Sequence, residues 1–138
     1  MSLQRNDAKR VGADEPLARY LIEKTSFVRT QNRVKFKVFM PFHLAVSVFR
    51  TGGLSDSDIW EIGQEEVAGP RNKTLYGRAE VLGSHVEQVA VQSPLQVVID
   101  EPPPRHANIV GWPDEQSTQQ LIAIKLAEMA TLTLKSTR

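Results

Sequence analysis

The residues best suited to chemistry lie in segment 102–113, where four prolines enclose a basic side chain, an imidazole, a carboxamide and an indole. Because each proline fixes φ and restricts the residue before it, the three consecutive prolines are predicted to hold the start of the segment extended. His106 can exchange a proton near neutral pH and is the candidate catalytic residue. Arg105 offers a fork for carboxylate or phosphate, and Asn108 can donate to an oxyanion. These two residues and Trp112 are the candidate ligand-binding residues of the segment.

The same residues also fit a structural role. In an irregular loop, His106 and Asn108 would hydrogen-bond to the backbone, and Arg105 would be solvated. Asp100 and Glu101 precede the prolines, but consecutive residues of a strand face opposite ways, so these carboxylates are not expected to share a site. The segment contains no nucleophile and matches no reaction signature.

A second candidate site is segment 50–55, where Arg50 and Thr51 precede two glycines and the start of a predicted helix. Glycines let the backbone approach a ligand closely, and a helix start points free N–H groups at it. Arg50 adds a positive charge, so Arg50 and Thr51 are candidate ligand-binding residues. The segment lacks the spacing and the lysine of a P-loop, which excludes that mode of nucleotide binding. A plain strand-to-helix turn also explains it.

Several kinds of chemistry are excluded or unsupported. The chain has no cysteine, which excludes thiol catalysis, cysteine-based zinc sites and disulfides. Its three histidines, His43, His85 and His106, do not have the spacing of metal ligands, so neither a metal site nor a cofactor is predicted.

The elements that must position these residues are predicted from periodicity and turn residues. We expect a flexible N-terminal tail over residues 1–14 and a single domain over residues 15–138. Strands are predicted over 19–22, 34–40, 44–50, 75–81, 85–91 and 95–100, the last three forming an antiparallel meander. With helices over 55–68 and 117–132, the class is α+β: a mostly antiparallel sheet of about five to six strands with two packed helices.

Each predicted helix has a start signal. Ser55 is the expected N-cap of the first helix, and its acidic outer face makes residues 55–68 a possible surface for a protein partner. Ser117 is expected to begin a capping box in the second helix. The residues of the second helix predicted to be buried are Leu121, Ile122, Leu126, Met129 and Ala130, with Lys125 and Glu128 exposed.

Charge and hydropathy limit the partners. The net charge is +1, with nine basic and four acidic residues in positions 1–40 and eight basic and twelve acidic residues in positions 41–138. Nucleic-acid binding through Arg29, Arg33, Lys35 and Lys37 was weighed but is not expected, because the overall balance is far from strongly basic. No apolar run is long enough for a bilayer, and the first ten residues lack a secretory pattern, so a cytoplasmic protein is expected.

Segments 39–41, 47–51, 59–63 and 105–113 resemble those of uncharacterised bacterial hypothetical proteins, a resemblance that implies no activity. Residues 49–51, Phe-Arg-Thr, are similar to a fragment of ADP-ribosyltransferases, in which an arginine at a strand end helps to hold NAD. The chain lacks the Ser-Thr-Ser strand and the Glu-x-Glu motif that accompany this arginine in those enzymes.

The expected function is therefore a small binding or accessory module of unknown ligand. The alternative is an enzyme acting on a phosphate- or carboxylate-bearing small molecule, with Arg50 and Arg105 as anion clamps and His106 as acid or base.

Overall fold

The computed structural model describes residues 11–89 and 94–135. Most of the expected N-terminal tail therefore lies outside the described residues. Of its last four residues, Val11 is half-buried, and its amide donates to Val97 O at 3.2 Å. No helix within the described ranges is both long enough and apolar enough to cross a membrane.

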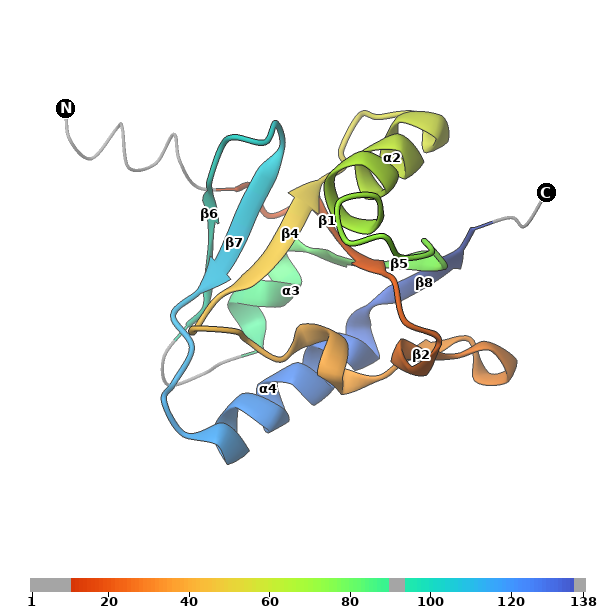
Figure 1. Cartoon of the computed structure of the whole chain (residues 1–138). Helices are drawn as coiled ribbons and strands as arrows, with labels where there is room; N and C mark the ends of the chain where they lie inside the picture. The colour runs from red at the N-terminus through yellow and green to blue at the C-terminus, as the bar shows by residue number, and fades with distance from the viewer. Residues whose placement is uncertain (1–10, 90–93, 136–138) are drawn as a thin grey trace, which may run out of the picture.

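A six-stranded sheet forms the centre of the molecule (Figure 1). Its strand order is β6-β7-β4-β1-β5-β8, and every neighbouring pair is antiparallel. The strands are β1 (Pro16–Leu21), β4 (Val46–Arg50), β5 (Gly77–Leu82), β6 (Gln96–Ile99), β7 (His106–Val110) and β8 (Thr131–Leu134). A separate ribbon joins β2 (Phe27–Val28) to β3 (Arg33–Val34). The predicted α+β class with a mostly antiparallel sheet is confirmed.

Helices cover both faces of this sheet (Figure 1). On one face, α2 (Asp56–Ile62) continues into the π-helical segment η4 (Gly63–Ala68) and packs on Ala18, Tyr20 and Phe49. On the other face, α3 (Gly83–Gln88) and α4 (Gln116–Met129) enclose the larger core. Side chains of a strand alternate between faces, so Leu17 and Leu21 join the larger core while Ala18 and Tyr20 contact the α2 side.

The predicted strand over 34–40 is wrong beyond Val34. The 3₁₀ turn η3 (Phe36–Phe39) lies there instead, and two others precede it, η1 (Lys24–Ser26) and η2 (Arg29–Gln31). Val38 and Phe39 are adjacent and both buried, whereas Phe36 is exposed. A half-buried strand cannot bury two consecutive side chains on one face, but a 3₁₀ turn packed on α4 can.

The predicted strand over 85–91 is also wrong where the structure describes it. Residues up to Gln88 form α3, which buries Val86, and Val89 directly after it is buried too. These valines are three residues apart, the spacing of one helix face. His85 Nδ1 accepts the amide of Leu82 at 3.1 Å and so satisfies a free N–H at the helix start. The expected meander does not form in the described residues, because β5 and β6 are not neighbours: β5 lies between β1 and β8, and β6 lies at the edge beside β7.

Two strands of the six-stranded sheet, and β2 of the separate ribbon, were not predicted. β7 follows the prolines and pairs with both β4 and β6, so Pro102–Pro104 form the turn of a hairpin instead of an extended lead-in. β8 takes the residues expected to end the last helix, because Leu132 alternates with threonines and pairs with Ala79 of β5. The helix itself ends at Met129.

The predicted helix starts had different outcomes. Ser55 does cap α2, since its Oγ accepts the amide of Asp58 at 3.2 Å. The capping box at Ser117 is wrong: α4 begins after Glu115, which Thr118 contacts through its hydroxyl at 2.5 Å. Leu121 was expected in the core but is 61% exposed.

Candidate functional site

The two candidate arginines lie side by side where β4 and β7 meet. The amide of Arg50 donates to Arg105 O at 2.8 Å. Glu101 Oε2 accepts from Arg50 Nη2 at 2.6 Å and from the Arg105 amide at 2.8 Å. Arg105 Nη1 donates to the carbonyls of Arg50 and Gly52 at 3.3 and 3.2 Å. These contacts fasten the proline turn to the end of β4 and occupy donors that an anion clamp would use.

His106 belongs to a second polar chain. Its Nε2 lies 2.5 Å from Ser47 Oγ, and its Nδ1 lies 2.8 Å from Asp100 O and 3.5 Å from Asp100 Oδ2. Asn108 Nδ2 donates to Asp100 Oδ2 at 2.9 Å. A hydroxyl, an imidazole and a carboxylate in this order resemble the parts of a nucleophilic triad. However, Asp100 approaches the ring mainly through its main-chain carbonyl.

The arginines and His106 do not converge on one centre. Phe49 and Arg50 are consecutive in β4, so their side chains leave opposite faces of the sheet. The His106 ring packs edge-on against Phe49, with ring centroids 5.3 Å apart. Asp100 and Glu101 likewise serve different partners. Trp112 is buried in the larger core, where its Nε1 donates to Ile109 O at 3.0 Å.

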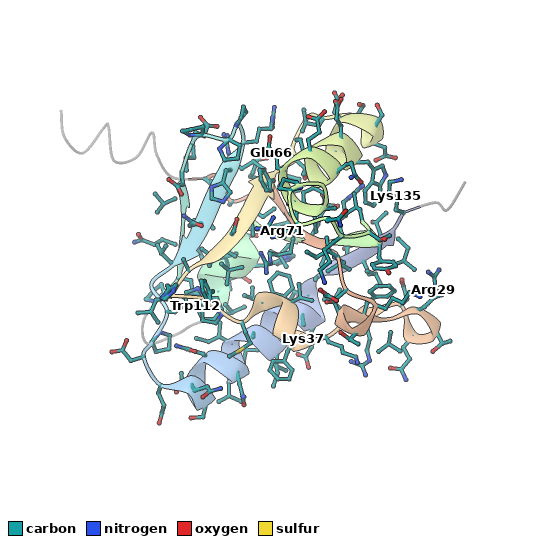
Figure 2. The ribbon with its side chains drawn as sticks, viewed as in Figure 1. Arg29, Lys37, Glu66, Arg71, Trp112 and Lys135 are labelled. Carbon is teal, nitrogen blue, oxygen red and sulfur yellow. The ribbon has the colours of Figure 1, made fainter. Side chains whose placement is uncertain are left out.

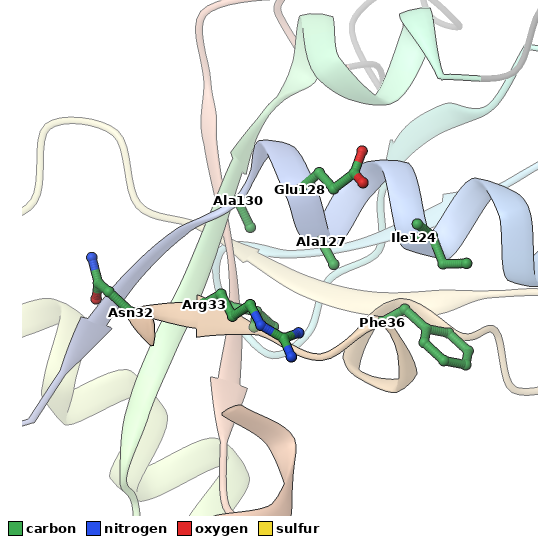
Figure 3. Close-up of a pocket in the computed structure, with 8 residues that line it drawn as sticks. Asn32, Arg33, Phe36, Ile124, Ala127, Glu128 and Ala130 are labelled. Carbon is green, nitrogen blue, oxygen red and sulfur yellow. The ribbon is translucent and has the colours of Figure 1, made fainter. Parts of the chain in front are cut away.

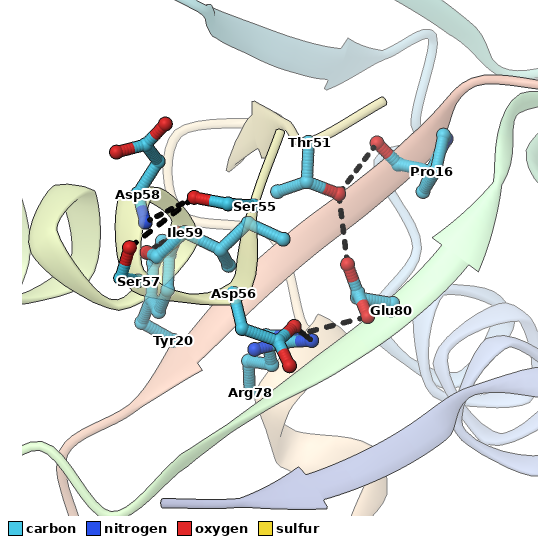
Figure 4. A network of polar contacts seen from close by, with 10 residues as sticks. All are labelled: Pro16, Tyr20, Thr51, Ser55, Asp56, Ser57, Asp58, Ile59, Arg78 and Glu80. Carbon is cyan, nitrogen blue, oxygen red and sulfur yellow. Dashed lines mark hydrogen bonds and ion pairs between the residues drawn. The ribbon is translucent and has the colours of Figure 1, made fainter. Parts of the chain in front are cut away.

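Thr51 joins a third network beneath α2 (Figure 4). Its Oγ1 donates to Glu80 Oε2 at 2.8 Å, and Arg78 Nε donates to Glu80 Oε1 at 3.1 Å. Arg78 also lies 3.4 Å from Asp56 Oδ1 and stacks on Trp60, with its guanidinium carbon 4.6 Å from the ring centroid. This network ties the start of α2 to β5. It explains Thr51 as a structural residue.

A groove beside α4, which sequence reasoning missed, lies on the described surface (Figure 3). We call it the α4 groove; its volume is about 430 Å³. It is lined by Asn32, Arg33, Val34, Phe36, Ile124, Ala127, Glu128 and Ala130. Phe36 and Ile124 are 37% and 38% exposed although both are large and apolar. No sequence pattern indicates this groove, because the alternation over residues 34–40 predicts Phe36 on the buried face of a strand.

Charge is segregated on the surface. Exposed basic residues precede and flank the α4 groove: Lys24, Arg29, Arg33 and Lys37. Exposed carboxylates lie along α2 and η4: Asp56, Asp58, Glu61, Glu65 and Glu66. Figure 2 shows Arg29 and Lys37 on one side of the molecule and Glu66 on the other. The two surfaces would therefore attract partners of opposite charge.

Comparison with known proteins adds no family. No protein-family model matches the chain, and no match was found among curated proteins or solved structures.

Proposed function

We propose that the protein is a binding module that holds a partner protein in the α4 groove. The observation that supports this proposal is the exposure of Phe36 and Ile124 beside a cation, Arg33. Leu121, one turn before Ile124 on α4, extends the apolar strip. Covering the remaining exposed area of such side chains contributes about 1 kcal/mol each. An apolar strip rimmed by polar groups is typical of an interaction surface.

The chemistry of the groove favours a partner segment that carries a carboxylate next to a large apolar side chain. Figure 3 shows Arg33 extending along the groove toward Phe36, while the carboxylate of Glu128 points away from it. The exposed Lys37, next to Phe36 in the sequence, adds to this positive charge. Opposite charge accelerates encounter and selects among partners, while apolar burial supplies affinity.

The acidic surface over residues 55–68 is the competing location for a partner. Its carboxylates are exposed, but Trp60 and Ile62 are only half-exposed, and Trp60 already packs on Arg78. This surface offers less apolar area for a partner to bury. We therefore place the partner on the α4 groove. We also propose that the protein is cytoplasmic.

A peptide selection tests this proposal. The folded chain is used to select from a displayed library of random peptides, and the affinities of the enriched peptides are measured by fluorescence anisotropy. We expect peptides with a carboxylate beside a large apolar residue. Phe36→Ala and Ile124→Ser should each weaken the affinity for these peptides about tenfold. Phe42→Ala is the matched control, because Phe42 is 78% exposed and lies outside the groove.

Two outcomes would contradict the proposal. Binding that is lost in the double variant Glu65→Lys, Glu66→Lys but kept in Phe36→Ala would move the partner to the acidic surface. Peptides whose affinity responds equally to Phe36→Ala and Phe42→Ala would show no site at the groove.

A second candidate function, an enzyme acting on a phosphate- or carboxylate-bearing small molecule, is supported by the contact between Ser47 and His106. His106 could accept the Ser47 proton as the hydroxyl attacks an acyl or phosphoryl centre. A fluorophosphonate probe tests this: Ser47 Oγ would displace fluoride and become covalently labelled. Labelling of the wild type that disappears in Ser47→Ala and His106→Gln supports the enzyme. No labelling of the folded wild type counts against it.

A further inference from the structure

The sheet opens between its two central strands. β1 pairs with β5 along all six of its residues but with β4 only through Leu17 and Ala18. Beyond Ala18 the two strands diverge (Figure 1). Where neighbouring strands separate, their main-chain N–H and C=O groups need hydrogen-bond partners other than each other, because an unpaired buried carbonyl is unfavourable.

Arg19 spans this opening. Its Nε donates to Val38 O of η3 at 3.0 Å, and its Nη1 donates to Ser47 O of β4 at 2.9 Å. The guanidinium therefore joins three elements, while its Nη2 makes no hydrogen bond within the described residues. Arg19 is half-buried as a residue and lines a cleft, so part of the residue reaches the surface.

A cleft of about 290 Å³ lies at the opening. Arg19, Ser26 and Lys37 are its lining residues with side-chain donors, and Ile22 is its half-buried apolar residue. Tyr20, Leu21 and Val38 also line it, but their side chains are buried in the two cores. Glu23 is its carboxylate, and that group is held by Lys73 at 2.9 Å. Lys37 Nζ donates to Thr25 Oγ1 at 2.7 Å, a neutral partner. The cleft thus contains two cations, Arg19 and Lys37, that no carboxylate engages within the described residues.

The positive charge here is poorly compensated. Burial, and then the positive charge of Arg71, lower the pKa of Arg19 to about 10. Two guanidinium groups are therefore close enough to repel each other, and a charge taken out of water is ordinarily paired. Figure 2 shows Arg71 over the centre of the sheet, near the opening. An anion would relieve both the repulsion and the loss of hydration.

We propose that this cleft binds the phosphate group of a small phosphorylated ligand, with Arg19 and Lys37 as contacts and Arg71 as a supporting charge. A phosphate oxygen can accept from Arg19 Nη2 while a second accepts from Lys37, the charge-assisted pattern that phosphate favours. A dianion matches this group of cations better than a single carboxylate does. This site is separate from the α4 groove and does not depend on it.

The test uses inorganic phosphate as the probe. Binding to the full chain is followed by phosphorus NMR and calorimetry, with sodium chloride holding the ionic strength constant. We expect saturable binding that weakens about tenfold in Lys37→Met, the equivalent of one charge-assisted hydrogen bond. Arg71→Gln should weaken it several-fold by removing a charge. Lys24→Met is the matched control, since Lys24 is an exposed cation that does not line the cleft.

Other outcomes would overturn the proposal. Equal weakening in Lys24→Met and Lys37→Met would mean that phosphate responds only to net charge. Acetate binding as tightly as phosphate would make the ligand class wrong. Absence of saturable phosphate binding to the folded wild type would remove the site altogether. Arg19→Lys is measured beside these variants, and if it does not fold, Lys37→Met and Arg71→Gln still decide.

Discussion

Replacing Glu80 with glutamine should destabilise the fold by about 2 kcal/mol, because it removes the main counter-charge of a buried cation. The Arg78 side chain is 8% exposed, and its Nη1 is buried without a partner in the described residues. Glu80 is 19% exposed and accepts from Arg78 Nε at 3.1 Å. Asp56 is the other carboxylate, but at 3.4 Å and 83% exposed it is strongly screened by solvent.

The magnitude follows from this geometry. Removing one partner of a buried ion pair typically costs about 3–5 kcal/mol. Glutamine keeps an acceptor oxygen, and Glu80 is not fully buried, so we expect about 2 kcal/mol. Arg78→Met keeps a long chain against Trp60 and leaves the Glu80 carboxylate bonded to Thr51, at a cost of about 1 kcal/mol. Once the cation is gone, Glu80→Gln adds little, so the double variant should also lose about 1 kcal/mol.

Urea unfolding at neutral pH measures all four proteins. The double-mutant cycle should give a coupling free energy of about 2 kcal/mol, with unchanged denaturant slopes. Additivity within about 0.5 kcal/mol would refute the reasoning, because it would mean that Arg78 does not depend on Glu80.

Three further predictions concern Tyr20, its neighbour Gly63, and the turn that contains Leu44. Tyr20→Phe should cost about 1 kcal/mol in urea unfolding at neutral pH, because the hydroxyl donates to Ile59 O at 2.6 Å. Burial raises the pKa of Tyr20, so the folded state keeps a proton that the unfolded state releases; wild-type stability should fall as pH rises above about 10, and Tyr20→Phe should reduce this fall. Gly63→Ala should cost about 2 kcal/mol by thermal unfolding, because a Cβ would lie 2.5 Å from the Tyr20 ring, whereas Gly12→Ala meets no atom and should be neutral. Leu44→Gly should raise stability by about 1 kcal/mol in urea unfolding, since Leu44 has φ of 60° in a two-residue turn; a lower stability would show that its exposed side chain matters more.

Local sequence patterns, such as a capping residue or a run of strand-forming residues, predicted several elements correctly. Ser55 caps α2 as expected, β4 and β6 lie within predicted strands, and β5 overlaps one. The same rules failed at residues 34–40, where an alternating sequence forms a 3₁₀ turn because Val38 and Phe39 both bury against α4. Tertiary packing decided that segment, and no local pattern records it.

For the candidate sites too, local sequence identified some residues, while contacts between distant segments decided others. The sequence identified Arg50 in one segment and Arg105 and His106 in another, and only the enzyme alternative joined them. The structure brings the three residues to the junction of β4 and β7. It could not supply Ser47, because the contact with His106 joins residues 59 positions apart through strand register. Arg19 carried no signal either, since its role follows from the separation of β1 and β4.

Charge reversal at Arg33 tests the central claim most directly. The affinity of a selected acidic peptide is measured by fluorescence anisotropy for the wild type, Arg33→Glu and the control Arg29→Glu, which reverses an exposed charge outside the groove. We predict that Arg33→Glu weakens binding at least about tenfold and that a peptide with lysine in place of its carboxylate recovers affinity for this variant. Equal losses in Arg33→Glu and Arg29→Glu, with no recovery by the lysine peptide, would contradict a partner seated in the α4 groove.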